Sequence, residues 1–152
     1  MSALSFRLAE KKDVPGIVEL LADDEFAESR EHDHPGAADS YAKAFEAMQG
    51  EHYNHILLAE QGGRVVAALQ LVFVPGLSRK GTTRAIVEGV RVASDLRGHD
   101  IGTALMKEAV RRAKEGGCGL VQLTSDNRRR RAHLFYRRLG FVQSHFGFKK
   151  EL

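Results

Sequence analysis

Apolar residues recur along the chain at two spacings, and each spacing predicts one kind of element. Strands are expected where apolar residues alternate or run together, at residues 5–9, 56–60, 65–74, 84–93 and 120–124, with a last strand or strand pair at 141–148. Helices are expected where an apolar stripe follows the helical repeat, after Asp13, after Pro35, from Ile101 to Ala113 and from Arg130 to Leu139. Glycines mark the boundaries, with a hairpin turn at Gly62-Gly63 and helix ends at Gly50, Gly116-Gly117 and Gly140.

The order of these elements, β-α-α-β-β-β-α-β-α-β, predicts an α/β fold, for which the label α+β is equally defensible. Strands alternate with helices only in the second half, which favours a mixed sheet with helices on both faces. The chain has 152 residues, the size of one ordinary domain, and no repeat or linker divides it. We therefore expect a single domain spanning residues 1–152.

Composition excludes several classes of protein. Hydrophobic residues make up 43% and charged residues 28% of the chain, which is typical of a globular domain. No apolar run approaches the roughly 18 residues of a membrane span, and no secretory signal is recognisable, so a cytoplasmic protein without a membrane partner is expected. The single Cys118 excludes an internal disulfide and a metal site of cysteines alone. We interpret it as a small buried hydrophobe.

The net charge is only +3, but the charges are distributed unevenly. Residues 23–39 contain seven acids against Arg30, a net charge of −6, and residues 126–138 contain six arginines against Asp126, a net charge of +5. Two such segments indicate either two partners of opposite charge or two solvated faces. The run from Arg128 to Arg131 would suit an RNA or phosphate patch, but no aromatic residue interleaves it before Phe135.

The most informative stretch joins the strand at residues 84–93 to the helix that begins at Ile101. The tight turn between them contains Gly98, and Gly102 follows in the first turn of the helix. A helix N-terminus presents unpaired N–H groups and the positive end of the helix dipole, so this turn predicts a phosphate site. It is not a Walker loop, because no Gly-Lys-Ser/Thr follows, and it has too few glycines for the dinucleotide fingerprint.

This turn resembles motif A of the GNAT N-acetyltransferases, Arg/Gln-x-x-Gly-x-Gly/Ala, in the form Arg97-Gly98-His99-Asp100-Ile101-Gly102. The run from Ala132 through Tyr136 to Gly140-Phe141 resembles motif B of the same family, Ala-x-x-x-Tyr-x-x-x-Gly-Phe. The order of the elements agrees with that family as well. The resemblance implies a mostly antiparallel mixed sheet with a bulged fourth strand and a splayed strand pair, and acetyl-CoA as co-substrate.

The resemblance also implies which residues hold acetyl-CoA. The turn would bind the pyrophosphate, and backbone N–H groups near Val90 and Val92 would bind the pantetheine arm and the thioester carbonyl. Asp100 replaces a glycine of the motif; Asp tolerates the backbone angles of glycine, and its carboxylate is expected to cap the turn. The family often has Asn where this chain has Arg129, and Asn127 lies nearby. The implied cofactor contacts are Val90, Arg91, Val92, Arg97, Gly98, His99, Asp100, Ile101, Gly102, Thr103, Asn127, Arg129, Ala132 and Phe135.

Two residues are implied for the chemistry of acetyl transfer. Tyr136 would be the general acid that protonates the leaving CoA sulfur; the alternative interpretation is a packed helix tyrosine. Glu88 would be the general base, directly or through water, a role that partial burial would favour; the alternative is a structural or substrate-orienting carboxylate. His145 is the reserve base.

The expected acceptor is the primary amine of a small molecule. By resemblance, the second helix and the loop before it form the acceptor wall, whose acids, with Glu25 and Glu28 as candidates, suit a cationic amine. Three C-terminal runs, at residues 124–127, 132–136 and 143–146, also resemble aminoalkylphosphonate N-acetyltransferases. A phosphonate would need a clamp, for which the candidates are Arg79, Lys80 and Arg84, and His145 is a further candidate substrate contact. The alternatives are a protein or peptide amine and a catalytically weak acyl-CoA sensor.

Other partners are not expected. The phosphates of CoA are a sufficient anion for part of the arginine run, so no nucleic acid is expected. The four histidines that could be counted as a metal set match no zinc spacing, so no metal is expected; they are His32, His34, His52 and His55. A homodimer stays open.

Overall fold

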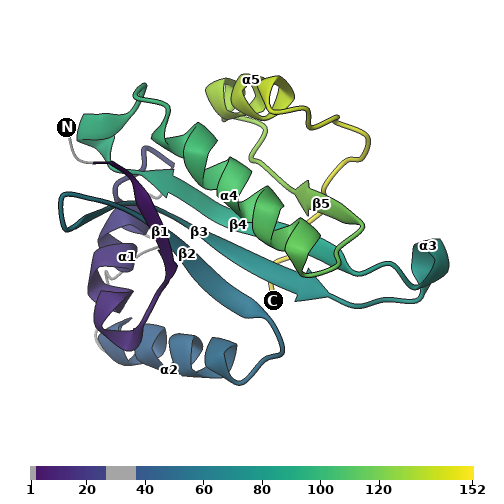
Figure 1. The fold of residues 1–152 in the computed structure, drawn as a ribbon, viewed down its shortest axis with the longest axis horizontal. Coiled ribbons are helices and arrows are strands. Elements are labelled where there is room, and N and C mark those ends of the chain that lie inside the picture. Colours follow the sequence, from purple (N-terminus) through teal and green to yellow (C-terminus); the bar gives the residue numbers. More distant parts are fainter. Residues whose placement is uncertain (1–2, 27–36) are drawn as a thin grey trace. The chain divides into compact units, whose positions relative to one another are not determined.

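The computed structural model describes residues 3–26 and 37–152. The chain divides into two compact units, Met1–Gln122 and Leu123–Leu152, and the expectation of one domain stays a prediction. The elements in chain order are β1 (Ser5–Leu8), η1 (Lys11–Asp13), α1 (Val14–Ala22), α2 (Ala37–Gln49), β2 (Asn54–Gln61), β3 (Arg64–Val74), α3 (Ser78–Gly81), β4 (Arg84–Val92), η2 (Ser94–Leu96), α4 (Ile101–Glu115), β5 (Leu120–Leu123) and α5 (Arg130–Arg138) (Figure 1).

Five strands form one sheet in the order β1-β2-β3-β4-β5. The first four strands pair antiparallel with their neighbours, and β5 lies parallel beside β4. The turn between β2 and β3 contains Gly62 with φ 60° and Gly63 with φ 79°. These left-handed angles are what a two-residue hairpin turn requires. The mixed, mostly antiparallel sheet and its predicted hairpin are therefore confirmed.

Helices cover both faces of this sheet, as predicted. Figure 1 shows α4 crossing one face and α1 and α2 against the other. Because side chains alternate along a strand, the adjacent Leu57 and Leu58 of β2 point to opposite faces, yet both are fully buried. On the α1 side, Ile17 and Leu20 pack with Leu58 in one apolar cluster. Each face of the sheet therefore has its own hydrophobic layer.

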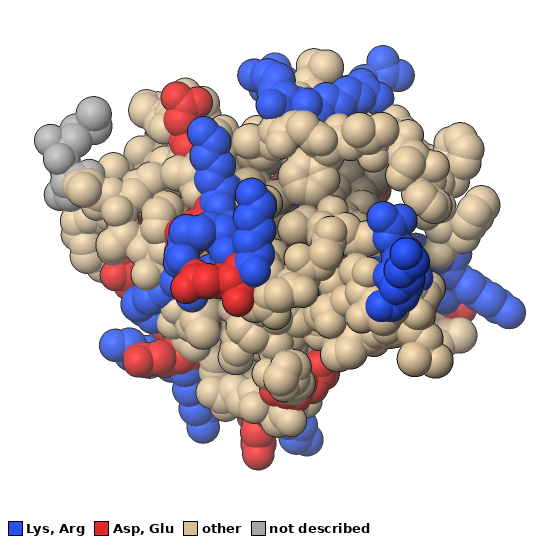
Figure 2. Space-filling model, turned by 45° about the vertical axis from the view of Figure 1, so that its right-hand side comes forward, with Lys and Arg blue, Asp and Glu red and all other residues tan. Residues whose placement is uncertain are grey.

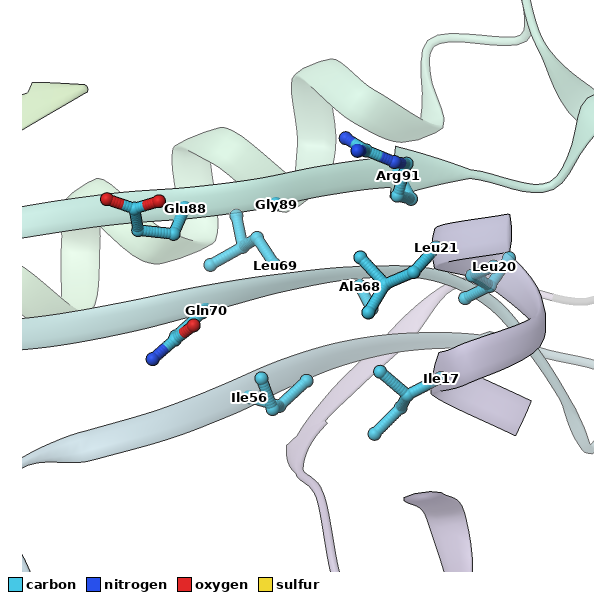
Figure 3. A pocket seen from close by; sticks show the side chains of 10 residues that line it. All are labelled: Ile17, Leu20, Leu21, Ile56, Ala68, Leu69, Gln70, Glu88, Gly89 and Arg91. Atoms are coloured by element: carbon cyan, nitrogen blue, oxygen red, sulfur yellow. The ribbon is translucent and has the colours of Figure 1, made fainter. Parts of the chain in front are cut away.

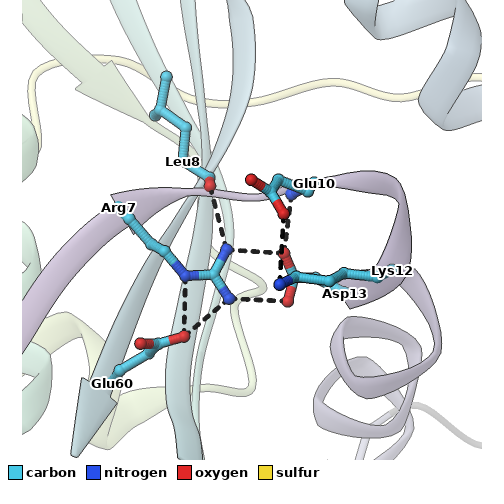
Figure 4. A network of polar contacts seen from close by, with 6 residues as sticks. All are labelled: Arg7, Leu8, Glu10, Lys12, Asp13 and Glu60. Carbon is cyan, nitrogen blue, oxygen red and sulfur yellow. Dashed lines mark hydrogen bonds and ion pairs between the residues drawn. The ribbon is translucent and has the colours of Figure 1, made fainter. Parts of the chain in front are cut away.

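Arg7 on β1 ties the start of α1 to the sheet (Figure 4). Its two terminal nitrogens each donate to a carboxylate oxygen of Asp13 at 2.8 Å, and its Nε donates to Glu60 on β2 at 2.8 Å. These hydrogen bonds hold the pKa of Asp13 below its usual value. Asp13 is the N-cap residue of α1, but its side chain makes no capping bond there and instead accepts from the Glu10 N–H. The network fixes the position of α1, whose other end lines the candidate site.

The predicted strand or strand pair at residues 141–148 is wrong, because the C-terminal unit contains no strand after α5. Apolar and aromatic residues do occur in this segment, but Val142, Phe146 and Phe148 are 83%, 84% and 92% exposed. A strand forms only where its backbone pairs with another strand, and apolar residues alone do not supply that partner. The predicted end of α5 is confirmed, since Gly140 has φ 91° and its N–H donates to the carbonyl of Arg137.

The segment between β3 and β4, residues 75–83, has an unusual backbone. It contains the short turn α3, in which Arg79 has φ 52° and Lys80 has φ 61°. Both angles are left-handed, a region that side chains with a Cβ adopt at a cost. Gly81 is the one residue of this turn whose type indicates a left-handed angle. The left-handed angles of the two residues before it could therefore not be predicted from the sequence.

Candidate active site

Strand β4 is bulged at Gly89. Gln70 of β3 pairs with Glu88, whereas Ala68 pairs with Arg91, so β4 has one residue more than β3 over this stretch. Gly89 has φ +58°, and an added Cβ would lie 3.6 Å from a leucine side chain of α1. Glycine is the residue that adopts this angle at little cost. A bulge leaves a residue outside the ladder of backbone hydrogen bonds, and this one lies where the resemblance implies a bulge.

The turn before α4 is built from two left-handed residues. Gly98 has φ 83°, and Asp100, the N-cap of α4, has φ 62° and ψ 12°. The first N–H groups of a helix have no partner within it and carry the positive end of its dipole. The Asp100 side chain makes no capping hydrogen bond with them, so the expected capping by its carboxylate is wrong. The turn is exposed from Arg97 to Asp100, and an anion can approach these N–H groups from solvent.

The C-terminal end of α1 is bound to this turn and to β4. The Ser94 N–H donates to the Asp23 carboxylate at 3.2 Å, and Arg97 donates to the Asp23 carbonyl oxygen at 2.7 Å. Asp24 forms an ion pair with Arg91 at 3.4 Å, and their side chains are only 7% and 16% exposed. These two acids of the negative segment therefore hold the fold together, and the charge of Arg97 is fixed beside the turn. His99 is held as well, since its Nδ1–H donates to the carbonyl of Leu96 at 3.1 Å.

A cavity of about 50 Å³ lies on the α1 side of the sheet at the bulge. Figure 3 shows Ile17, Leu20 and Leu21 of α1 at one end of it and the side chains of Gln70 and Glu88 at the other. Ile56 and Ala68 line it from the sheet, and Arg91 of β4, which pairs with Asp24, lines it toward the α1 end. Apart from Arg91, the cavity is therefore apolar at the α1 end, and it is polar at the other.

Gln70 was not predicted as a site residue. Its amide nitrogen donates to Asn54 Oδ1 at 2.7 Å, and the Asn54 amide nitrogen donates to Glu51 Oε2 at 3.1 Å. Asn54 is buried, with 9% exposed. The chain of donors fixes the Gln70 amide, with its nitrogen toward Asn54 and its oxygen available as an acceptor. One signal was present in the sequence, because Gln70 is the polar residue that interrupts the apolar run of residues 65–74.

The predicted base Glu88 lines the cavity, but it is exposed and so lacks the partial burial that would favour this role. Its cross-strand neighbour is Gln70. Arg84 lies at the start of β4 and donates to Gln122 and Ser78 at 3.1 Å each. It does not line the cavity. Glu25 is exposed, and Glu28 lies outside the described residues.

The C-terminal unit carries the residues of the second motif. Tyr136 of α5 is half-buried, with its ring edge-to-face to Phe135 at 5.2 Å and to Phe141 at 6.0 Å between centroids. Arg129 and Ala132 are half-buried and Asn127 is exposed. These rings fix the side chain of Tyr136, and its role as an acid stays a prediction. His145 is exposed and shares a 2.6 Å hydrogen bond with Ser144.

Several of the exposed charges are paired with one another. In the arginine run, Arg128 donates to the Asp126 carboxylate at 2.8 Å and holds the pKa of Asp126 far below its usual value. Along α4, hydrogen bonds from Arg111 and then Arg112 lower the pKa of Glu108 to about 2. Figure 2 shows basic side chains interleaved with acidic ones on part of one face of the molecule. Such pairing reduces the positive surface that a nucleic acid would need.

Other site chemistries find little support in the described part of the chain. His, Cys, Asp and Glu form no group of three there that could hold a metal ion. Burial raises the pKa of the Cys118 thiol, which disfavours the reactive thiolate. Among residues 3–26 and 37–152, every helix is too short or too polar to span a membrane.

Comparison with known proteins identifies the family. A sequence profile of the acetyltransferase (GNAT) family matches residues 15–141. The chain is 38% identical over 98 residues to the aminoalkylphosphonate N-acetyltransferase of Salmonella typhimurium. That match covers 64% of this chain and 63% of the relative, less than two thirds of its length.

Solved structures give the same result for the fold. A transcriptional regulator from Bacillus halodurans superposes with a TM-score of 0.93 at 39% identity, over 99% of this chain and 100% of that one. A glucosamine-6-phosphate N-acetyltransferase from Arabidopsis thaliana superposes with a TM-score of 0.80 at 20% identity, over 98% of each chain; this second likeness shows the fold alone. The family profile spans most of the chain, and the chain therefore belongs to the acetyltransferase (GNAT) family, the N-acetyltransferases that its two motifs indicate.

Proposed function

We propose that the protein transfers the acetyl group of acetyl-CoA to the primary amine of a small molecule. The observation that carries this proposal is that two structural features follow one another along the chain within one compact unit. A strand bulged at Gly89 leads into a left-handed turn at the N-terminus of α4. The turn suits a pyrophosphate and the bulge suits an extended arm that ends in a thioester.

The donor is held by backbone groups and by Arg97. The N–H groups at the start of α4 receive the pyrophosphate, and the fixed guanidinium of Arg97 adds a positive charge beside it. N–H groups near Val90 and Val92, at the bulge, bind the pantetheine arm and the carbonyl oxygen of the thioester. They stabilise the negative charge that develops on this oxygen during attack.

The reaction is a direct transfer. The nitrogen lone pair of the neutral amine attacks the carbonyl carbon, so a C–N bond forms and the C–S bond breaks. Glu88 accepts the proton that the amine nitrogen loses, directly or through water. The Tyr136 hydroxyl donates a proton to the departing sulfur, so that CoA leaves as a thiol.

Aminoalkylphosphonates are the acceptors with the most specific support, because the Salmonella relative is named for them. Arg79 and Lys80 in the exposed α3 turn remain candidates for a phosphonate clamp. A polycationic acceptor has less support than the sequence indicated. Asp23 and Asp24 of the negative segment are already engaged with the α4 turn and with Arg91.

The deciding experiment is a panel of amines assayed with acetyl-CoA by release of free thiol. The panel contains small primary amines, aminoalkylphosphonates, polyamines and a lysine peptide. Turnover of a small amine supports the proposal, and turnover of the peptide alone contradicts it. Binding of acetyl-CoA without turnover of any amine would instead identify an acyl-CoA sensor.

Two variants assign the parts of the site. Gly102→Val places a side chain in the first turn of α4, where the backbone meets the pyrophosphate, and should weaken acetyl-CoA binding much more than it lowers stability. Glu88→Gln should flatten the acidic limb of the pH–rate profile. If the limb persists in a folded Glu88→Gln protein, Glu88 is not the base.

A further inference from the structure

The cavity beside the bulge restricts which carbon substituent the acceptor amine can carry. The apolar end is lined by Ile17, Leu20 and Leu21 of α1 and by Ile56 and Ala68 of the sheet. Leu20 is 9% exposed and Ala68 only 3%, so a group placed among them is removed from water. Arg91 also lines the cavity toward this end, with its guanidinium paired to Asp24. A cationic group there would lose its hydration and gain no partner among the lining residues.

The polar end offers acceptors of hydrogen bonds. The strand register places Gln70 between Ile56 of β2 and Glu88 of β4, and Figure 3 shows the Gln70 amide and the Glu88 carboxylate at the same end of the cavity. The Gln70 nitrogen is committed to Asn54, so the amide oxygen is the part of Gln70 left for a ligand. A carboxylate and an amide oxygen together match the N–H groups of an amine.

The size of the cavity limits the apolar part. A buried water needs roughly 10–15 Å³ of such space, and the cavity has about 50 Å³. It therefore accommodates about four groups of that size, which corresponds to a short alkyl group and excludes an aromatic ring or a sugar.

We propose that the preferred acceptor is a primary amine that carries a compact apolar substituent of about two to four carbons next to its nitrogen. This inference rests on the proposed function. The nitrogen lies between Gln70 and Glu88, and the substituent is buried against Ile56, Ala68 and α1. Selection between amines then comes mainly from this apolar contact. An apolar pocket that fits a methylene group disfavours a substrate lacking that methylene by about tenfold or more.

The test uses the full chain, acetyl-CoA and two homologous series of acceptors. One series is the linear alkylamines from methylamine to hexylamine, and the other is the 1-aminoalkylphosphonates with side chains of increasing length. The value of kcat/KM should rise about tenfold or more from the shortest member to an optimum at two to four carbons and then fall. A diamine of optimal length should be at least about tenfold poorer than the matching alkylamine, because its second cation enters the apolar end.

Variants that change the cavity should move the optimum in opposite directions. Ala68→Val fills part of the cavity and should favour a shorter substituent, whereas Ile56→Ala enlarges it and should favour a longer one. Ile86→Ala is the matched control, because Ile86 is also a half-buried strand isoleucine but does not line the cavity. It should leave the optimum unchanged. Misfolding lowers every rate together and does not shift an optimum in two directions.

Two results would overturn the inference in distinguishable ways. Turnover that is indifferent to substituent length, or an optimum that Ile56→Ala and Ala68→Val leave in place, overturns this inference and leaves the proposed function standing. The absence of thiol release with every amine of both series and with the polyamines, in a protein that binds acetyl-CoA, overturns the proposed function and this inference with it.

Discussion

Replacing Asp100 by glycine tests how the α4 turn binds its anion. Asp100 has φ 62°, a left-handed angle that costs an aspartate on the order of 1 kcal/mol, and we expect the turn to keep this angle whether or not acetyl-CoA is bound. Relief of that strain should therefore change the free energy of unfolding and not the affinity for acetyl-CoA. Glycine also loses about 0.5–1 kcal/mol more conformational entropy on folding. The two terms offset each other, and the free energy of unfolding should change by less than about 1 kcal/mol.

The affinity for acetyl-CoA should change through charge alone. The Asp100 carboxylate makes no capping hydrogen bond, so the cofactor does not have to displace it from the N–H groups. Repulsion between one exposed carboxylate and a phosphate at close range is about 1 kcal/mol in water. Asp100→Gly should therefore tighten binding by about fivefold. The gain should nearly vanish at about 1 M salt, where the screening length falls to about 3 Å.

Calorimetric titration of three proteins at two ionic strengths decides this prediction. Asp100→Asn is the matched control, because asparagine tolerates the same backbone angles but carries no charge. It should bind acetyl-CoA about as tightly as Asp100→Gly. Equal or weaker binding by both variants would show that no phosphate lies beside residue 100. Tighter binding by the glycine variant alone would show that the turn must change its backbone on binding, and would refute a change through charge alone.

The remaining predictions concern stability, catalysis and the bulge. Arg7→Met leaves Asp13, whose side chain is 9% exposed, without its main partner and should lower the free energy of unfolding in urea by about 2–3 kcal/mol. Because hydrogen bonds from Arg7 lower the pKa of Asp13, the wild type should keep this stability above about pH 4 and lose it as the pH falls further; an equal acid dependence in Arg7→Met would contradict the assignment. Tyr136→Phe should reduce kcat by about 10²-fold or more at unchanged acetyl-CoA affinity, and a kcat near that of the wild type would remove Tyr136 from the role of acid. Gly89→Ala forces a Cβ into φ +58° and should lower stability by about 1 kcal/mol with a loss of kcat/KM; unchanged values of both would show that the bulge does not depend on glycine.

Most helices and strands could be predicted from the sequence, because the residues that determine them lie within or next to each element. The apolar stripe of α4, the two glycines of the β2–β3 hairpin and Gly140 after α5 each act within a few residues, and the structure has these elements nearly where they were expected. The last strand failed for a non-local reason. Residues 141–148 contain the aromatic and apolar residues that strands favour. Pairing with another strand is a property of the whole sheet, however, and these residues have no strand partner within the described part of the chain.

The same distinction applies to the site. The turn before α4 could be predicted, because its glycines and the following helix are contiguous. The cavity could not be predicted, because strand register brings Ile56, Gln70 and Glu88 together from three strands. The polar chain from Gln70 through Asn54 to Glu51 also depends on that register. In the sequence it appeared only as one glutamine within an apolar run.

The acidic segment after α1 shows how charge patterns and contacts can disagree. Its surplus of carboxylates suggested a surface for a cationic acceptor, yet Asp24 is only 7% exposed against Arg91. Asp23 accepts from Ser94 and Arg97. The end of α1 that supplies these contacts also supplies Leu20 and Leu21 to the cavity. One helix end therefore positions both the turn proposed for the cofactor and the apolar wall proposed for the acceptor. Asp23 and Asp24 thus have a structural role, since they hold the cofactor turn and the acceptor cavity in position. The contacts proposed to select the acceptor come from the apolar residues Leu20 and Leu21 beside them.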